Sequence, residues 1–512
     1  MRQSRAIKGQ RKKGAIFGYV NIAVKNLVSL VYTPLLLHYI GNAEYGVYQT
    51  TFSLIFSLSL LSMGFTEAYV RFYMRFKESR EQSNDYIKKL NGLYLVTYFV
   101  IALMAMIIGI AMAFRAEFFF SKQFSYNEIE LARILMIIMS VNIGVTFLST
   151  PFDAFIMVHE EFVFQQTRQL FTQIAQPVLA VVLLEVGFGA VGVAGAQLIL
   201  TVILLLLNIR FSLKKLGMEF AFWPYDGKLL KGILVFSFWV LLSQIFDLIN
   251  NQVPNYLLAA MTTATIVATF AISLQIRSIF ISLSVTMSNV FIPKINNIVA
   301  CSDDNEILTK LMTKVGRYQS LLFIYVYGGF LIVGRYFVDI WAGDTNQAAY
   351  GLAAAMTLPL FIPLIQNTGI EIQRAKNRHK MRSLIYLFTA LLDIAVSVIL
   401  IPRYGYWATA IGYILSILIG PGLFMNWYYH RRLGIDMKFF WKCQFPSIVN
   451  GIVIIGIGML LTYFVPVQNP ITFIGYSIIY SLIYFVSIYF FVLNKQEKDV
   501  FVRFFRGRKT IK

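Results

Sequence analysis

Long apolar runs constrain this chain more than any other feature of its sequence. Residues 90–114 and 446–465 contain no charged side chain, and about 20 apolar residues in a helix cross a hydrocarbon core of about 30 Å. Only 14% of all residues are charged, against about a quarter in soluble domains. The sequence therefore predicts an all-α integral membrane protein.

The hydropathy pattern predicts fourteen transmembrane helices joined by short connections. The expected spans are 15–38, 47–70, 90–114, 131–151, 168–186, 191–211, 230–253, 264–292, 318–338, 351–370, 383–401, 406–428, 446–465 and 471–493. No connection is long enough to form an independent soluble domain. We therefore expect one membrane-embedded unit.

The chain has a net charge of +20, and its Lys and Arg residues are unevenly distributed. They concentrate at both termini and in every second connection, whereas the intervening connections hold few. Because basic residues favour the cytoplasmic side of a membrane, this bias predicts that both termini are cytoplasmic. The basic residues do not gather on one soluble face, which argues against a nucleic-acid partner.

The stretch YIGNAEYGVYQT, residues 39–50, lies between the first two expected spans on the outer side. Gly41 and Gly46 are expected to allow a turn and close helix packing there. Glu44 is its only charge, and its three tyrosines suit a membrane interface. We interpret the stretch as an outer turn.

Weak internal similarity suggests two halves in the same orientation. Pro34 and Pro254, expected at the ends of the first and seventh spans, are separated by nearly as many residues as Gly189 and Gly405. Pro254 is also expected to break its helix and to act as a hinge. The resulting domains are 1–211 with six helices, 212–430 with six helices, and 431–512 with two extra helices and a basic cytosolic tail.

Several expected spans carry polar or ionisable side chains on one face, and such residues inside a membrane are functional candidates. They are Asn21 and Lys25 in the first span, Glu67 and Arg71 at the end of the second, Gln244, Asp247 and Asn251 in the seventh, and Arg277 in the eighth. We interpret these as the lining of one water-filled cavity; the alternative is buried structural pairing, for example of Lys25 with Asp247. Asp393, in the eleventh span, is a candidate for a second polar site that binds a coupling ion.

Motifs for enzyme chemistry are missing from the sequence. The string GFGAVG at 187–192 fits a dinucleotide fingerprint by letter, but it lacks a preceding strand and a following acidic residue. The four histidines are scattered, and no phosphate-binding loop of the Walker type occurs. We therefore expect no catalytic residues, no metal and no cofactor, with transport coupled to a Na⁺ or H⁺ gradient.

Four stretches together carry a family resemblance: PLLLHYIGNAEYGVYQTTFSL, SMGFTEAYVRF, FDAFIMVHEEFVFQQTRQL and LIPRYGYWATAIGYILS. With the span count and the two-half arrangement, they make the chain similar to bacterial polysaccharide (O-antigen type) flippases of the multidrug/oligosaccharidyl-lipid/polysaccharide (MOP) exporter superfamily. The resemblance implies two six-helix lobes around a central cavity plus two C-terminal helices. It also implies a multi-pass protein of the bacterial inner membrane.

The resemblance further implies a substrate and its binding residues. The substrate would be an undecaprenyl-pyrophosphate-linked oligosaccharide, moved from the cytoplasmic to the outer leaflet by alternating access. Cationic side chains of the first, second and eighth helices line the cavity of related flippases, and Lys25, Arg71 and Arg277 occupy those helices here. A polysaccharide polymerase and chain-length machinery are the implied protein partners, besides membrane lipids.

Two alternatives stay open. An ion-coupled multidrug antiporter would share the fold but should have a mainly acidic cavity, whereas the charges in these spans are mainly basic. A membrane polysaccharide polymerase would need a sizeable outer loop or a cytosolic active site, and the outer connections are short and poor in His, Asp and Arg.

Overall fold

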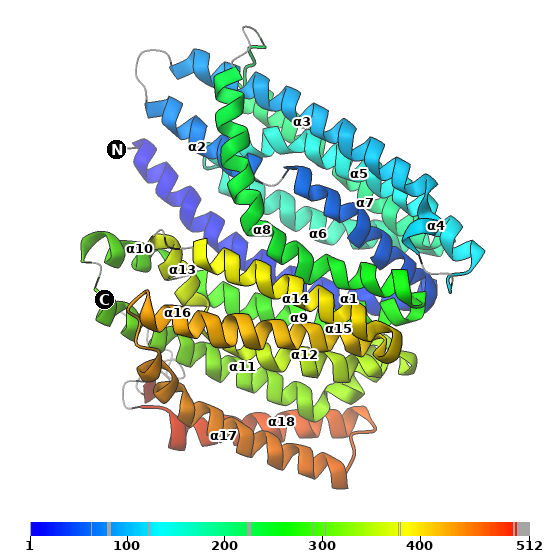
Figure 1. Cartoon of the computed structure of the whole chain (residues 1–512), viewed down its shortest axis with the longest axis vertical. Coiled ribbons are helices and arrows are strands. Elements are labelled where there is room, and N and C mark those ends of the chain that lie inside the picture. The colour runs from blue at the N-terminus through cyan, green and yellow to red at the C-terminus, as the bar shows by residue number, and fades with distance from the viewer. Residues whose placement is uncertain are drawn as a thin grey trace. The chain divides into compact units, whose positions relative to one another are not determined.

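The computed structural model describes residues 2–498 apart from 63, 79–82, 121–122, 223–226, 290, 303, 377, 379 and 495–496. Over these residues every regular element is a helix (Figure 1). The longer ones are α1 (Arg2–Ser57), α3 (Ser83–Phe114), α5 (Tyr126–Val158), α6 (Phe162–Glu185), α7 (Gly189–Arg210), α8 (Gly227–Met261), α9 (Ala264–Asn289), α11 (Asn305–Ala342), α12 (Ala348–Ile365), α14 (Lys380–Tyr404), α15 (Tyr406–Ile417), α17 (Met437–Phe464) and α18 (Pro470–Ser487). The shorter ones are α2 (Phe65–Glu78), α4 (Ala116–Phe119), α10 (Ile292–Cys301), α13 (Asn367–Ala375) and α16 (Asn426–Arg431). This confirms the predicted all-α fold class.

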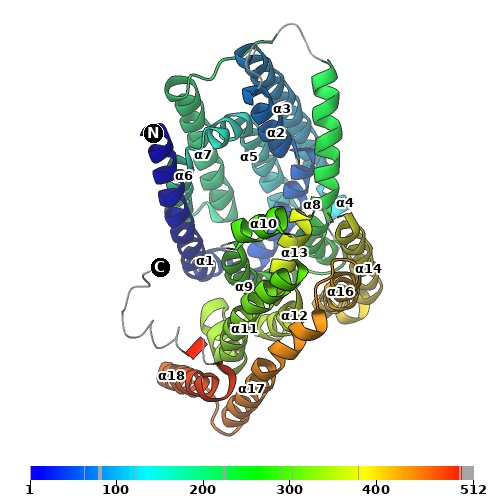
Figure 2. The same cartoon turned by 90° about the vertical axis from the view of Figure 1, so that its left-hand side faces the viewer.

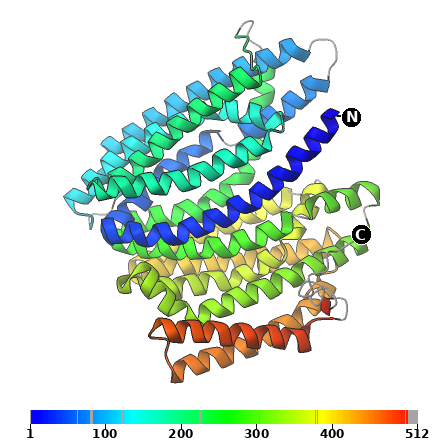
Figure 3. The ribbon, with the colours of Figure 1, turned by 180° about the vertical axis from the view of Figure 1, so that it is seen from behind.

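The helices form two compact units. Unit 1 comprises Met1–Ala271 and Ile394–Thr409, and unit 2 comprises Ile272–Asp393 and Ala410–Lys512, so α9, α14 and α15 contribute to both. Within unit 1, α3 packs against α5, α5 against α7, and α1 against α6 (Figure 2). Within unit 2, α11 packs against α12, α17 and α18, and Figure 3 shows the C-terminal helices in orange and red.

Eleven helical stretches of described residues are long and apolar enough to cross a membrane. The first, Val20–Lys77, covers both the first and the second expected span. Helices α6 and α8 coincide with the fifth and seventh expected spans, although neither is among the eleven. Each expected span thus has a helix, whereas the number fourteen stays a prediction.

The expected outer turn at 39–50 is a kink inside α1. The backbone leaves helical geometry at Gly41, where φ is 70° and ψ is 175°, a conformation that glycine adopts without a Cβ penalty. Gly46 follows in close contact with α9, because a Cβ added there would lie 1.9 Å from the backbone oxygen of Ala264. The two glycines therefore have the roles expected of them, a turn and a close helix approach.

The expectation that two prolines end their helices was wrong. Pro34 lies inside α1, and α8 continues beyond Pro254 to Met261. A proline removes one backbone N–H, but breaking the helix in a hydrocarbon core would leave several more backbone groups without partners, so continuing the helix is favourable. A hinge role for Pro254 stays a prediction.

Two local features recur in the two halves of the chain. The kink of α1 and the break between α8 and α9 follow Pro34 and Pro254 at similar sequence distances. Gly189, the first residue of α7, and Gly405, which directly precedes α15, both have φ of 53°. The internal repeat itself, and the domains drawn from it, stay a prediction.

One buried ion pair attaches the C-terminal helices to α11 within unit 2. Arg317 of α11 donates from Nε and Nη2 to the two carboxylate oxygens of Glu497, each at 2.9 Å. The same guanidinium donates to the backbone oxygens of Cys443 in α17, at 2.6 Å, and Val492, at 3.1 Å. This bidentate, charge-assisted arrangement fixes three separate segments to one side chain.

Candidate functional site

The predicted cation of the eighth span, Arg277, is buried on α9 in unit 2 with 3% of its surface exposed. Its Cζ lies 4.4 Å from the ring centroid of Tyr413, a cation–π geometry, and the two side chains also hydrogen-bond. Ser273, Ser284 and Ser288 lie on the same helix and are buried as well. The polar stripe expected on this span is therefore a buried helix face.

Farther along this face, α9 is tied to α11. Gln319 Nε2 donates to Ser288 Oγ at 2.7 Å and to Ser284 Oγ at 3.1 Å. Ser284 Oγ in turn donates to the backbone oxygen of Leu364 at 2.7 Å. These bonds give Ser284 and Ser288 a structural role, whereas Arg277, earlier on the same helix face, lies against the ring of Tyr413.

Asp393, predicted as a separate polar site, belongs to the same cluster as Arg277. It is buried on α14, with 3% of its surface exposed. Asp393 and Arg277 both interact electrostatically with the Tyr413 side chain. The structure therefore brings together two candidates from the eighth and eleventh expected spans through Tyr413.

Sequence reasoning missed a second arginine in this part of unit 2, Arg382. It lies in the first turn of α14, just before the expected span 383–401. Its Cζ is 4.9 Å from the ring centroid of Tyr386, which itself interacts electrostatically with Tyr413. The signal available in the sequence was the spacing of Arg382, Tyr386, Thr389 and Asp393, which places all four on one helix face.

The predicted cations of unit 1 are more exposed. Lys25 on α1 is exposed, and it makes no ion pair with any side chain that the structure describes. Arg71 on α2 is also exposed, and its Cζ lies 4.8 Å from the ring centroid of Phe236 in α8. Glu67 and Asn251 are exposed on α2 and α8.

Asn21 differs from these residues because it connects two helices. It is 3% exposed, and its Nδ2 donates to the backbone oxygen and to Oε1 of Gln166 in α6, at 2.9 and 2.7 Å. The side chains of Gln244 and Asp247 lie outside the described residues, although both positions belong to α8. A pairing of Lys25 with Asp247 therefore stays a prediction.

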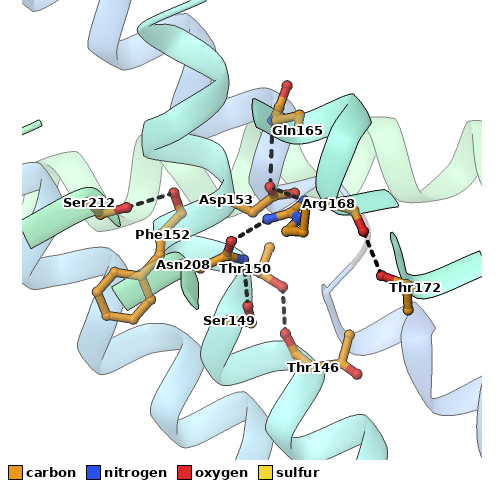
Figure 4. Close-up of polar contacts among 10 residues, drawn as sticks. All are labelled: Thr146, Ser149, Thr150, Phe152, Asp153, Gln165, Arg168, Thr172, Asn208 and Ser212. Atoms are coloured by element: carbon orange, nitrogen blue, oxygen red, sulfur yellow. Dashed lines mark hydrogen bonds and ion pairs between the residues drawn. The ribbon is translucent and has the colours of Figure 1, made fainter. Parts of the chain in front are cut away.

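A charged network that the sequence analysis did not single out joins α5, α6 and α7 (Figure 4). Arg168 Nη2 forms an ion pair with Asp153 Oδ1 at 2.7 Å, and Arg168 also donates to Asn208 Oδ1. Asn208 Nδ2 donates to Ser149 Oγ at 2.9 Å. The charge of Arg168 is balanced by Asp153, and the hydrogen-bonding partners come from all three helices. We therefore interpret the network as a structural link between α5, α6 and α7. It includes Asp153 and Arg168, two of the four charged residues of the stretch FDAFIMVHEEFVFQQTRQL.

The kinked stretch of α1 at 39–50 also has polar contacts within unit 1. Glu44 Oε2 accepts from the backbone N–H of Ala190 at 3.3 Å, in the first turn of α7. A carboxylate is favourable at a helix N-terminus because of the unpaired N–H groups there. Tyr39 donates its hydroxyl to Glu185 at the end of α6. The stretch at 39–50 therefore fastens α1 to the α6–α7 hairpin.

Metal chemistry has no support among the described residues, where no group of three or more His, Cys, Asp or Glu side chains could hold an ion. The candidate charged groups in unit 2 are Arg277 and Arg382, each against a tyrosine ring, and the carboxylate Asp393. Such an arrangement suits the binding of an anion.

Several solved structures share the fold of this chain at low sequence identity. The chain is similar to "Lipid II flippase MurJ, inward closed conformation", with a TM-score of 0.75 and 16% identity over 96% of this chain and 100% of that one. An inward-facing multidrug resistance MATE family transporter of the MOP superfamily matches with a TM-score of 0.61 and 13% identity over 81% of this chain and 96% of that one. A MOP superfamily transporter from Pyrococcus furiosus matches with a TM-score of 0.53 and 15% identity over 84% and 96%. The protein is a multi-pass membrane protein whose fold is that of these flippase and transporter structures.

The family follows from a sequence match to residues 12–299, more than half of the chain, described as "Polysaccharide biosynthesis protein". The chain belongs to this polysaccharide biosynthesis family. No curated protein sequence matches it.

Proposed function

We propose that the protein is a flippase that moves an undecaprenyl-pyrophosphate-linked oligosaccharide from the cytoplasmic to the outer leaflet by alternating access. The product would serve assembly of a polysaccharide such as O-antigen, capsule or exopolysaccharide. The family and the fold support a transporter in polysaccharide biosynthesis. The observation that carries the substrate class is Arg277, a buried cation inside a candidate membrane span.

A cation in that position has an energetic cost, which makes it a candidate for a functional role. Insertion scales assign about 2.5–3.5 kcal/mol to an arginine at the centre of a membrane helix. A pyrophosphate that leaves the headgroup region needs a compensating charge, and a guanidinium binds phosphate oxygens through two parallel hydrogen bonds. Lys25 and Arg71 would add charge from unit 1, Lys25 as a point charge without that fork.

Coupling to a Na⁺ or H⁺ gradient is part of the proposal. Asp393 is the candidate residue, because a carboxylate beside Arg277 and Tyr413 can gain or lose a small cation as the local charge changes. The protein would act in the bacterial inner membrane with both termini cytoplasmic, beside a polysaccharide polymerase and chain-length machinery. Transport without any gradient in proteoliposomes would count against coupling.

An ion-coupled multidrug antiporter is the second candidate, favoured by the likeness to MATE transporters. Its cargo is commonly cationic and would need a cluster dominated by carboxylates. The unit 2 cluster instead contains Arg277 and Arg382 with Asp393. The charge balance therefore favours an anionic cargo. A polysaccharide polymerase has no corresponding observation in its favour.

The test is flipping by the purified full chain in proteoliposomes that contain undecaprenyl-pyrophosphate-linked sugar, read by protection from an impermeant sugar-modifying enzyme. Arg277→Ala and Lys25→Ala are expected to abolish flipping while the protein remains folded and membrane-inserted. Arg403→Ala, an exposed arginine at the end of α14, is the matched control. Wild-type protein that moves no lipid-linked sugar, or full activity of both test variants, would refute the proposal.

A further inference from the structure

The buried face of α14 contains more than the residue predicted from the sequence. Tyr386, Thr389 and Asp393 are 8%, 0% and 3% exposed, and Arg382 precedes them on the same face and is half-buried. Positions separated by three or four residues lie above one another on a helix. One face of α14 therefore carries four polar side chains in a row, from the half-buried Arg382 near the start of the helix to the buried Asp393.

Arg382 has unused hydrogen-bonding capacity in that row. Its Nε is buried and makes no hydrogen bond, and no carboxylate forms an ion pair with it in the described part of the chain. Arg133 and Arg277 also have a buried Nε without a hydrogen bond, but Arg133 forms ion pairs with Glu130 and Glu117, and Arg277 hydrogen-bonds Tyr413. Arg168 and Arg317 each bind a carboxylate and further oxygens. Buried donors are nearly always satisfied, so this one points to an acceptor that arrives from outside the chain.

Aromatic side chains connect Arg382 to Arg277. Arg382 lies over the Tyr386 ring, and both residues interact electrostatically with Tyr429. Tyr386 and Arg277 both interact electrostatically with Tyr413. Each guanidinium thus lies against one tyrosine ring, Arg382 against Tyr386 and Arg277 against Tyr413, and these two tyrosines interact electrostatically.

We propose that Arg382 is a second anion-binding residue of unit 2, at which the pyrophosphate of the lipid-linked substrate binds before it reaches Arg277. This inference rests on the proposed function and adds a residue to it. A flexible lysine would bind any anion, whereas a guanidinium against a ring presents a fixed fork that suits phosphate oxygens. The position near the start of α14, in a connection expected to be cytoplasmic, matches the side from which the substrate arrives.

The test measures binding of farnesyl pyrophosphate, farnesyl monophosphate, farnesol and inorganic pyrophosphate to the detergent-purified full chain by calorimetric titration. Arg382→Gln is expected to weaken farnesyl pyrophosphate binding about tenfold or more, since charge-assisted hydrogen bonds are lost. Arg382→Lys should give an intermediate affinity and a smaller preference for pyrophosphate over monophosphate. Arg374→Gln, which removes an exposed arginine paired with Glu371, should leave both quantities within about twofold of wild type.

The outcomes separate the two proposals. If wild-type protein prefers farnesyl pyrophosphate to farnesol and Arg382→Gln binds it equally well, the role of Arg382 is refuted and the proposed function stands. If wild-type protein shows no such preference, both are refuted. If Arg382→Gln fails to fold, Arg382→Lys decides, and wild-type affinity and selectivity in that variant overturn the inference. Equal loss of inorganic pyrophosphate binding identifies the phosphate itself, and not the lipid chain, as the group recognised.

Discussion

Removing the arginine of the Arg317–Glu497 pair should loosen the C-terminal helices of unit 2. Arg317→Met keeps most of the apolar stem of the side chain but deletes its hydrogen bonds to Glu497, Cys443 and Val492. The two partners are 12% and 7% exposed, so water does not replace the lost contacts. The variant leaves a buried carboxylate and two backbone oxygens without their donor.

The magnitude follows from this burial. Loss of one partner from a buried pair costs about 3–5 kcal/mol. At about 2–4 °C per kcal/mol for a unit of 150–250 residues, the unfolding midpoint should fall by about 10 °C. Arg317→Met combined with Glu497→Leu should recover more than half of that loss, because an apolar replacement of both partners is often neutral or stabilising.

The assay is thermal unfolding of the detergent-purified full chain, with hydrogen exchange over residues 488–494 as a local readout. Lys310→Met is the matched control on α11, because its ion pair with Glu306 is 65% and 75% exposed and should leave the midpoint unchanged. A midpoint of Arg317→Met within 2 °C (roughly) of wild type, with unchanged exchange, would show that the pair does not hold these helices.

Three further variants test other contacts. Gly46→Ala should lower the unfolding midpoint, because its Cβ would meet the backbone oxygen of Ala264 at 1.9 Å, whereas Gly195→Ala, with open space around it, should not. Burial lowers the pKa of His159, which directly follows α5, below its usual value of 6.5. The unfolded state therefore binds more protons than the folded state, and the free energy of unfolding should fall as pH drops below about 6.5. His159→Gln should remove that part of the pH dependence. Asp153→Asn breaks an ion pair between α5 and α6, and increased hydrogen exchange at the α5–α6 turn would report it.

The membrane architecture could be predicted because apolar length is a one-dimensional property of the sequence. Every expected span has a helix, and the turn at 39–50 appears as the kink at Gly41. Whether Pro254 breaks its helix could not be predicted in this way. Whether a freed carbonyl finds another donor depends on neighbouring helices, which hydropathy does not describe.

The candidate site was predicted less completely, because its residues meet only through tertiary packing. Arg277 was found because a cation inside an apolar span is conspicuous. Its proximity to Asp393 depends on Tyr413 of α15, and no spacing in the sequence encodes that contact. Arg382 was missed because it falls one residue before an expected span, where basic residues are ordinary membrane anchors. Its significance depends on the observed start of α14 and on the ring of Tyr386.

Stability measurements can separate an arginine that holds the fold from one that binds a ligand. Arg382→Met removes a cation–π contact worth about 0.5–1 kcal/mol at exposed sites, but it also removes a buried donor without an acceptor, which costs about 1–3 kcal/mol. The second effect is the larger, so the unfolding midpoint of Arg382→Met should equal or exceed that of wild type while pyrophosphate binding is lost. Arg317→Met, measured beside it, should lose about 10 °C for the opposite reason. A fall in midpoint for Arg382→Met as large as that for Arg317→Met would mean that Arg382 is a structural residue.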